Sequence, residues 1–348
     1  MGQVAYQPFV RRNIAILILL LGVLATTWAR DERKTIVRNK TLAFTAVALP
    51  PPQILRAHLG VFQLEAAWQL TLGSPVFGGY SALVPLPDGR LLAISDLGNY
   101  LAFSPPGERP FKPRYGPLLP NPGGQKTSVD IESATRDPVS GDLWLGLEGT
   151  NMVIRTNSRW IETGRVRPRS MRSWGVNTGP EAMTRLKDGR FVLLREAPLQ
   201  WWRPRRHDAV IFPGDPVKAP DTARHFVFDG PANFDPVDMV QLPDGRLMIL
   251  MRTLTWPFPQ RFAGRIAIAD PADIRPGTTW HVTEVARIAS SLPIDNFEAM
   301  AVTPRPDGRL TVWLMSDDNQ ASLQRTLLWK LIVDPAALPH AKRSRATR

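Results

Sequence analysis

The sequence contains no cysteine. Disulfide bonds, thiolate nucleophiles and cysteine-ligated metal sites are therefore excluded. The chain also has only five histidines, and none of them has the spacing of a zinc ligand. They are His58, His207, His225, His281 and His340. A Ser-His-Asp triad is disfavoured as well, because the nearest match to a nucleophile elbow, residues 79–83 (GYSAL), lacks the final glycine.

Modules that bind nucleic acid are also missing: there is no zinc-finger spacing, no aromatic RNA-binding motif and no basic helical region. The chain nevertheless carries 43 Lys and Arg against 31 Asp and Glu, a formal net charge of +12. This balance favours anionic partners, although an arginine-rich coding bias would produce the same excess. We therefore expect an anionic small-molecule substrate such as a phosphate ester, and no nucleic acid.

An uncharged apolar run lies near the N-terminus, from Ile14 to Ala29, after Arg11-Arg12 and before a charged segment. A basic stretch followed by such a run is typical of a secretory signal peptide. The poor cleavage site at residues 27–29 (TWA) leaves an uncleaved membrane anchor as an alternative, and a buried core helix as a third. We predict that residues 1–30 form an export or anchor helix detached from the core, followed by a linker over residues 31–60. The folded domain would then be periplasmic or otherwise extracytoplasmic, secreted or held at the membrane by this segment.

Five segments of the remaining chain share one layout. They are Tyr80–Asp96, Asp130–Glu148, Pro180–Glu196, Pro236–Arg252 and Asn296–Asp318. Each has a short apolar stretch, a turn with Asp-Gly or Ser-Gly, and a second apolar stretch that ends in polar or charged residues. Asp-Gly between two strand-like runs is a strong indicator of a β-hairpin, because glycine takes the positive φ of a tight turn.

The hairpins recur about every 50 to 60 residues, which leaves room for the four strands of one propeller blade. We therefore predict an all-β fold, a β-propeller over residues 61–336, with a basic disordered tail at 337–348. We expect six blades, with five as the alternative; a degenerate sixth would lie in Gly264–Ala289 or straddle the two ends. The strand Leu327–Val333 would close the ring against Leu64–Leu72. A β-sandwich is the rival architecture, and no segment with helical periodicity follows the N-terminal run.

Acidic residues recur at two places in the repeats, so a propeller would collect them at one mouth of its channel. Glu132, Glu181 and Glu298, with Asp130, Asp235 and Asp238, begin the first strands; Asp96, Glu148, Glu196, Asp317 and Asp318 end the second strands. Clustered carboxylates repel one another unless they are protonated or bridged by a cation, for which Ca²⁺ is the usual choice. Turn capping is the simpler explanation for any single one of them.

We assign roles to these residues as a hypothesis. The predicted Ca²⁺ ligands are Glu132, Glu181, Glu298 and Asp96, and the predicted catalytic carboxylates are Glu132, Glu148 and Asp317. A bound cation would polarise a phosphoryl oxygen and position a water molecule. Arg195, Arg252 and Arg325 would hold phosphate oxygens, unless they serve as ion-pair partners of the carboxylates.

The same segments resemble the phytase-like family, with esterase-like activity of phytase. The resemblance lies in residues 94–96 (ISD), 130–134 (DIESA), 296–300 (NFEAM), and Ser316-Asp317-Asp318-Asn319 together with residues 324–328 (QRTLL). It extends over roughly Leu70 to Asp334. The resemblance implies a secreted or periplasmic propeller-like domain that hydrolyses phosphate esters or other esters.

Two functions remain open at this point. The first is a Ca²⁺-dependent phosphoesterase or esterase of the cell envelope, and the second is a non-catalytic propeller that binds a ligand or partner, with the carboxylates as a structural ion site. The segment Trp201–His207, with two tryptophans among arginines, would stack on a sugar, lie at a membrane interface or pack between blades.

Overall fold

The computed structural model describes residues 41–120, 129–200, 202, 205–255, 261–320 and 324–339. The predicted export or anchor helix over residues 1–30 and most of the predicted basic tail lie outside the described residues. Within the described ranges, no helix is long and apolar enough to cross a membrane.

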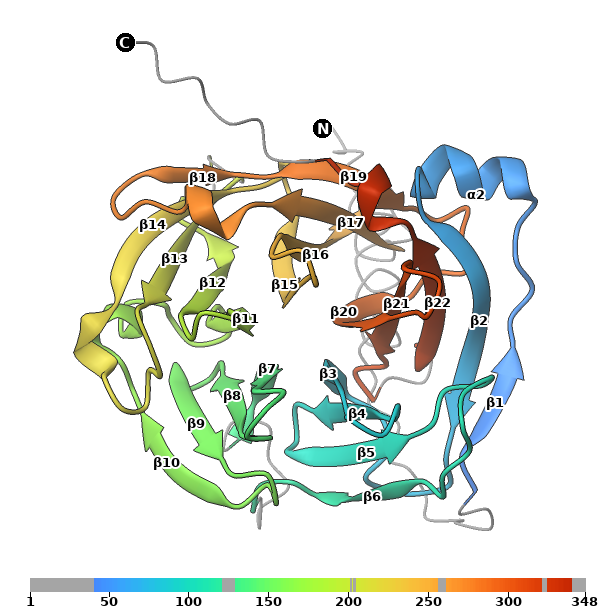
Figure 1. Ribbon diagram of the computed structural model, residues 1–348, viewed down its shortest axis with the longest axis horizontal. Helices are drawn as coiled ribbons and strands as arrows, with labels where there is room; N and C mark the ends of the chain where they lie inside the picture. The colour runs from blue at the N-terminus through green and yellow to red at the C-terminus, as the bar shows by residue number, and fades with distance from the viewer. Residues whose placement is uncertain are drawn as a thin grey trace, which may run out of the picture.

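The described chain forms five sheets arranged around a central axis, a five-bladed β-propeller (Figure 1), and their strands are antiparallel except for one short edge strand. The first sheet consists of β3 (Tyr80–Pro85), β4 (Leu91–Ser95), β5 (Asn99–Phe103) and β6 (Arg114–Pro117). The second consists of β7 (Ile131–Arg136), β8 (Leu143–Leu147), β9 (Met152–Thr156) and β10 (Glu162–Val166). The third consists of β11 (Pro180–Arg185), β12 (Phe191–Pro198), β13 (Arg206–Phe212) and β14 (Arg224–Asp229), with β18 (Thr279–His281) parallel to β14 at its edge.

The fourth sheet consists of β15 (Asp235–Gln241), β16 (Leu247–Thr255), β17 (Arg261–Ala269) and β19 (Thr283–Ile288). The fifth consists of β20 (Asn296–Pro304), β21 (Leu310–Asp317), β22 (Leu327–Val333), β2 (Gln63–Thr71) and β1 (Ala43–Ala46). Short 3₁₀ helices lie at Arg169–Met171, Pro220–Thr222, Pro271–Asp273 and Pro335–Ala337. The first strand of each repeat, β3, β7, β11, β15 or β20, is the one nearest the axis (Figure 1).

The five predicted hairpins are confirmed, since each connects the first and second strands of one sheet. All five turn glycines have positive φ, from +79° at Gly141 to +99° at Gly245. Ring closure follows the prediction as well. The last strand, β22, pairs with β2, with Ala67 opposite Trp329, so that the two ends of the described chain share the fifth sheet.

The preference for six blades is not confirmed, because five sheets account for the described strands. Residues 264–289, proposed as a degenerate sixth repeat, supply β17 and β19 to the fourth sheet and β18 to the third. They form no separate sheet because they lack a hairpin of their own and pair instead with strands of both neighbouring blades.

One α-helix, α2 (Pro52–Leu59), was not expected from the sequence. Its eight residues make only about two turns, too few for a helical period to stand out. Pro52 occupies the first helical position, where its missing N–H costs nothing, and Leu59 is buried. Together with β1, this helix lies within residues 31–60, the segment predicted as a linker.

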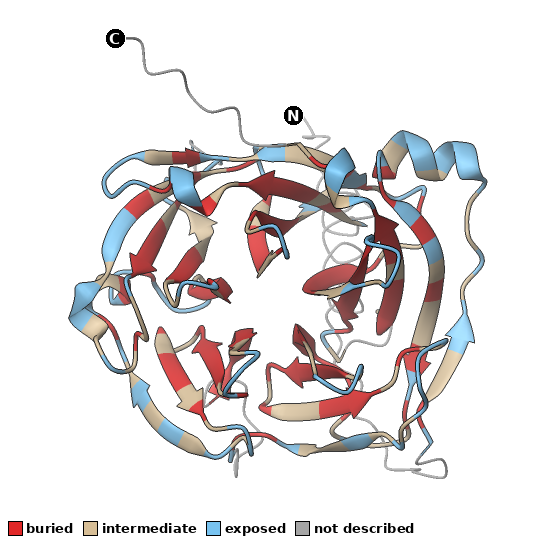
Figure 2. Ribbon diagram, in the orientation of Figure 1, coloured by how far each residue is buried: buried red, intermediate tan, exposed pale blue. Residues whose placement is uncertain are grey.

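Five apolar clusters make up the core, and each fills the gap between two adjacent sheets. Strands near the axis are therefore covered on both faces, which explains runs such as Leu247–Met251 in which every side chain is fully buried. Figure 2 shows these buried residues along the strands around the axis. Because every blade depends on its two neighbours, we expect the described propeller to unfold as one unit.

Arg246 joins the C-terminal segment to the fourth blade. Its side chain is 6% exposed and donates hydrogen bonds to the carbonyl oxygens of Pro335, Leu338 and Pro339 at 2.6, 2.7 and 2.9 Å. Arg190 follows the equivalent turn of the third blade, is 35% exposed and pairs with Asp188 of its own turn. Arg246→Ala should therefore lower the free energy of unfolding by about 3 kcal/mol, because three carbonyl groups, of which that of Leu338 is buried, lose their hydrogen-bond donor.

Urea denaturation of the full-length chain measures this loss, with Arg190→Ala as the matched control. The control should change stability by no more than about 0.5 kcal/mol. Equal effects of the two substitutions would show that the contacts between Arg246 and the C-terminal segment contribute nothing to the free energy of unfolding.

Candidate active site at the mouth of the propeller

Each axis-lining strand contains a β-bulge at the same place, close to its first residue. The extra residues are Ser81, Glu132, Glu181, Val237 and Glu298, one from each blade. A bulge re-aims the side chain of its extra residue and is frequent beside active sites. The recurrence of the bulge thus brings the three predicted glutamates to corresponding positions in the ring.

A second row lies opposite, where the second strand of each blade ends. It consists of Asp96, Glu148, Glu196, Arg252 and Asp317. Backbone hydrogen bonds between the first and second strands fix this row. The N–H of Asp96 donates to the carbonyl oxygen of Gly79, and the N–H of Glu148 donates to the carbonyl oxygen of Asp130, at 2.9 Å each. In this row the first, second, third and fifth blades each contribute a carboxylate, and the fourth blade contributes an arginine. We call both rows together the mouth ring.

Two groups of carboxylates, made of mouth-ring residues together with Asp130 just before β7, are close enough to share a cation. Oxygen atoms of Asp130, Glu132 and Glu148 lie within 4.8 Å of one another, and so do those of Glu148, Glu181 and Glu196. Glu148 belongs to both groups. Oxygens this close repel one another unless a proton or a cation lies between them, and Ca²⁺ binds six to eight such oxygens.

The remaining predicted ligands, Asp96 and Glu298, belong to neither of these groups. Glu298 instead accepts a hydrogen bond from the amide of Asn296 at 2.6 Å and contacts Arg252 at 3.2 Å. The structure therefore divides the predicted ligand set: Glu132 and Glu181 lie in the two groups, whereas Glu298, on the fifth blade, and Asp96, on the first blade, lie outside them. Their role as ligands stays a prediction.

Among the described residues, Arg252 brings a positive charge into the mouth ring. Its guanidinium lies 3.2 Å from both Glu196 and Glu298, and it donates to the side-chain oxygen of Asn296 at 3.1 Å. A quarter of its side chain is exposed. The surrounding carboxylates raise the pKa of Arg252 further above its ordinary value, against the effect of burial. One fixed positive charge thus offsets part of the negative charge of the ring.

The other two arginines predicted to bind substrate lie outside the ring. Arg195 donates to the backbone carbonyl and the hydroxyl of Thr178, at 3.2 and 3.3 Å. Arg325 pairs with Asp295 at 3.5 Å. In the described part of the chain, neither forms an ion pair with the two rows, so Arg252 is the one that contacts them.

Two carboxyl groups of the ring hold protons unusually well. Burial raises the pKa of Glu181 well above its usual range, and the charges of Glu196, Glu132 and Glu148 raise it further, while Arg252 lowers it. Burial, with Glu298, Asp96 and Asp318, likewise raises the pKa of Asp317. Asp235, opposite Arg252 in the strand register, has a pKa of about 6 for the same main reason, burial. In the absence of a cation, protons take part in neutralising the ring.

These raised pKa values predict how stability depends on pH without a divalent cation. Unfolded Glu181 loses its proton near pH 4.5, whereas folded Glu181 keeps it to a much higher pH. The folded chain therefore binds more protons above pH 4.5, so its free energy of unfolding should fall as pH rises from about 5 to 8. Urea denaturation in EDTA across this range measures the slope.

Glu181→Gln should make that slope shallower, because the amide does not titrate, while Asp317 and Asp235 keep their share of it. Glu162→Gln, on the outer strand β10, should leave it unchanged. A stability that rises with pH across this window in EDTA would contradict the raised pKa values.

The block Ser316–Asn319 closes the ring between the fifth and first blades. Asp318 accepts the backbone N–H of Gly79 and the hydroxyl of Thr326, both at 3.0 Å. Asp317 accepts the backbone N–H of Asn319 at 2.6 Å. This block, one of the segments that carry the family resemblance, thus fixes Asp317 at the point where the last blade meets the first.

Two further residues act near the ring in ways the sequence did not indicate. The Nδ1 of buried His207 lies 2.6 Å from the backbone carbonyl oxygen of Glu196. Burial lowers the pKa of His207 to about 4, so its imidazole is neutral and Nδ1–H donates to this carbonyl. Asp238 lies outside both rows and accepts the backbone N–H of Met300 at 2.6 Å, which joins the fourth and fifth blades. Burial raises the pKa of Asp238 to about 8.

Comparison with known proteins gives one family match. The phytase-like family, described as esterase-like activity of phytase, matches residues 75–320, which include every residue of the mouth ring. A search of curated proteins finds no match.

Solved structures share the general architecture at low identity. A chain of the nidogen/laminin complex is 12% identical, with a TM-score of 0.42, 84% of this chain covered and 97% of the other. Glutaminyl cyclase of Myxococcus xanthus is 14% identical, with a TM-score of 0.42, 78% of this chain covered and 97% of the other. A luciferin-regenerating enzyme is 12% identical, with a TM-score of 0.39, 84% of this chain covered and 92% of the other.

Proposed function

The chain belongs to the phytase-like family, and from this premise we propose that it is a cell-envelope hydrolase of phosphate esters or other esters, assisted by Ca²⁺ at the mouth ring. The observation that supports this proposal best is the shared position of Glu148. It stands in both carboxylate groups, and the neighbouring Glu196 pairs with Arg252. Anion-holding and cation-holding groups therefore lie side by side, as hydrolysis of a charged ester requires.

In this mechanism the residues have distinct roles. A cation held by either of the two groups that share Glu148, Asp130 with Glu132 or Glu181 with Glu196, would polarise the phosphoryl or carbonyl oxygen of the ester. Glu132 and Glu148 would position the attacking water, and one of the two carboxylates would accept its single proton as its oxygen bonds to the reacting centre. Arg252 stabilises the negative charge that develops on the substrate oxygens. Asp317, whose pKa is raised, donates a proton to the departing alkoxide as the ester bond breaks.

A non-catalytic propeller with a structural ion site is the second candidate. The pairing of Arg252 with Glu196 and Glu298 favours it, because a guanidinium engaged with two carboxylates has fewer donors left for a substrate. Under this alternative, the carboxylates and their cation tie neighbouring blades together around the axis.

Hydrolysis assays on the full-length chain separate the two candidates. A panel of p-nitrophenyl phosphate esters and carboxylic esters should be turned over with calcium and not with EDTA. Asp317→Asn should lower kcat by about 10² to 10⁴, the range for losing a general acid, while calcium still raises the melting temperature. Glu162→Gln should leave both properties intact. A calcium-dependent melting temperature without turnover of any substrate would favour the binding propeller.

The cell-envelope location in this proposal rests on the sequence of residues 1–30, with their basic start and apolar run. An extracytoplasmic location also agrees with the choice of cation, because calcium is abundant outside the cytoplasm and a site built from carboxylates tolerates weak binding there.

A further inference from the structure

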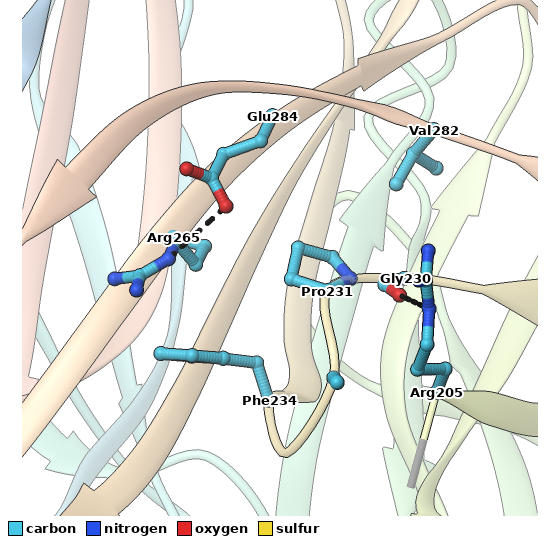
Figure 3. Close-up of a pocket in the computed structure, with 8 residues that line it drawn as sticks. Arg205, Gly230, Pro231, Phe234, Arg265, Val282 and Glu284 are labelled. Carbon is cyan, nitrogen blue, oxygen red and sulfur yellow. Dashed lines mark hydrogen bonds and ion pairs between the residues drawn. The ribbon is translucent and has the colours of Figure 1, made fainter. Parts of the chain in front are cut away.

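A pocket of about 330 Å³ lies between the third and fourth sheets, apart from the mouth ring (Figure 3). Its walls include Arg205, Pro231, Phe234, Arg265, Val282 and Glu284. A volume of this size is at the lower end of the range for small-molecule sites. Arg265 lies opposite Met251 in the strand register, one residue before Arg252, which places the pocket one strand further out in the fourth sheet.

Arg265 forms a rigid charged wall on one side of this pocket. Its Nε is 3.1 Å from a carboxylate oxygen of Glu284, and its terminal nitrogen donates to the carbonyl of Gly264 at 2.8 Å. The guanidinium also lies over the ring of Phe234, 4.1 Å from the ring centroid. These contacts fix the guanidinium before any ligand arrives, which reduces the entropy lost on binding.

Arg205 lies on the side of the pocket opposite Arg265 (Figure 3). Its Nε donates to the carbonyl of Gly230 at 3.1 Å and lies 3.4 Å from Asp229. Within the described ranges of the chain, its two terminal nitrogens have no hydrogen-bond partner. The side chain is 59% exposed. These terminal nitrogens can therefore take a carboxylate or phosphate group in the two-pronged geometry that guanidinium favours.

The charges around the pocket leave a positive excess. Three guanidinium groups, those of Arg205, Arg265 and Arg287, share two carboxylates, Asp229 and Glu284. One positive charge remains when His281, the other partner of Asp229, is counted as neutral. Since the chain as a whole carries +12, its field also attracts anions to this face.

Apolar side chains complete the pocket between the two arginines. Pro231 and Phe234 form one side and Val282 lies across from them (Figure 3). We propose that this pocket binds a small ligand that combines an apolar body with one oxyanion, a carboxylate or a phosphate-type group. The oxyanion binds the terminal nitrogens of Arg205, and the body packs against Phe234, Pro231 and Val282. This site does not depend on the function proposed for the mouth ring.

Isothermal titration calorimetry of the full-length chain with benzoate and with phenylphosphonate tests the proposal. Excess EDTA removes any cation that would attract the anions to the mouth ring. At least one probe should bind saturably at one site per chain, and the pair distinguishes a carboxylate from a phosphate-type ligand. Benzyl alcohol, which has the same ring without the anion, should bind about tenfold more weakly or not at all.

Arg205→Ala should weaken binding of the anionic probe by about tenfold or more. Arg206→Ala is the matched control, because Arg206 is the next residue, is exposed and does not line the pocket. Val282→Trp should block binding by filling the space, and Glu148→Gln should leave binding unchanged because it alters only the mouth ring. The proposal is overturned if neither anion binds saturably, if Arg206→Ala weakens binding as much as Arg205→Ala, or if Glu148→Gln abolishes it.

Discussion

We expect calcium to stabilise the wild-type chain and Glu148→Gln to abolish that stabilisation, the largest effect predicted for any single carboxylate. Glu148 is common to both groups of ring carboxylates, so its loss breaks both at once. A cation that binds only the folded state stabilises it by about 2.7 kcal/mol at 100 times its dissociation constant. For a chain of this size that corresponds to a rise of about 5 °C in melting temperature.

Thermal denaturation with calcium and with EDTA measures the rise in melting temperature. Two further variants serve as a control and a comparison. Glu162→Gln removes a carboxylate that pairs with Arg165 on the outer strand β10, and it should keep the full rise. Glu298→Gln tests a predicted ligand that lies beside the two groups, and it should reduce the rise without abolishing it. A full rise in Glu148→Gln would contradict the shared position that we assign to this residue.

Arg252→Met should destabilise the cation-free chain by about 3 kcal/mol. The substitution removes the guanidinium that lies 3.2 Å from both Glu196 and Glu298, and losing one partner of a buried ion pair is costly. The expected cost is at the lower end of the usual range because a quarter of the Arg252 side chain reaches solvent. Urea denaturation in EDTA measures the loss.

Arg195→Met is the matched control for this substitution. Arg195 also lies near the end of a second strand, but its partner is the neutral Thr178, so the cost should stay below about 1 kcal/mol. The double variant Arg252→Met with Glu298→Gln should recover part of the loss, because one uncompensated charge is removed. Equal costs at Arg195 and Arg252, with no recovery in the double variant, would show that the guanidinium does not neutralise the ring.

The architecture could be predicted because its main determinants are local. Each hairpin turn needs a glycine with positive φ, and Gly141 and Gly245 mark such turns in the sequence without reference to distant contacts. The number of blades depends on pairing between distant segments instead. The short strand β18 leaves the fourth repeat and pairs with β14 of the third, and no local pattern in residues 279–281 indicates this.

The composition of the site could be predicted in part for the same reason. Glu132 and Glu148 stand at recurring positions of the repeats, which indicated that the fold would gather carboxylates at one end. The β-bulge that sets the position of Glu132 has no sequence signature, because it arises from the register of two paired strands. Arg252 occupies the place that Glu196 fills one blade earlier. The repeats already align these two residues, but the contacts of Arg252 with Glu196 and Glu298 depend on how neighbouring blades pack, which no local pattern indicates.

The central claim is that the mouth ring holds a divalent cation through Glu148. Anomalous X-ray diffraction from crystals of the full-length chain grown with calcium tests this claim most directly. We expect an anomalous difference peak bonded to Glu148, in the group with Asp130 and Glu132, in the group with Glu181 and Glu196, or in both. Ordered carboxylates with no peak among them, at a calcium concentration that saturates any rise in melting temperature, would contradict the account.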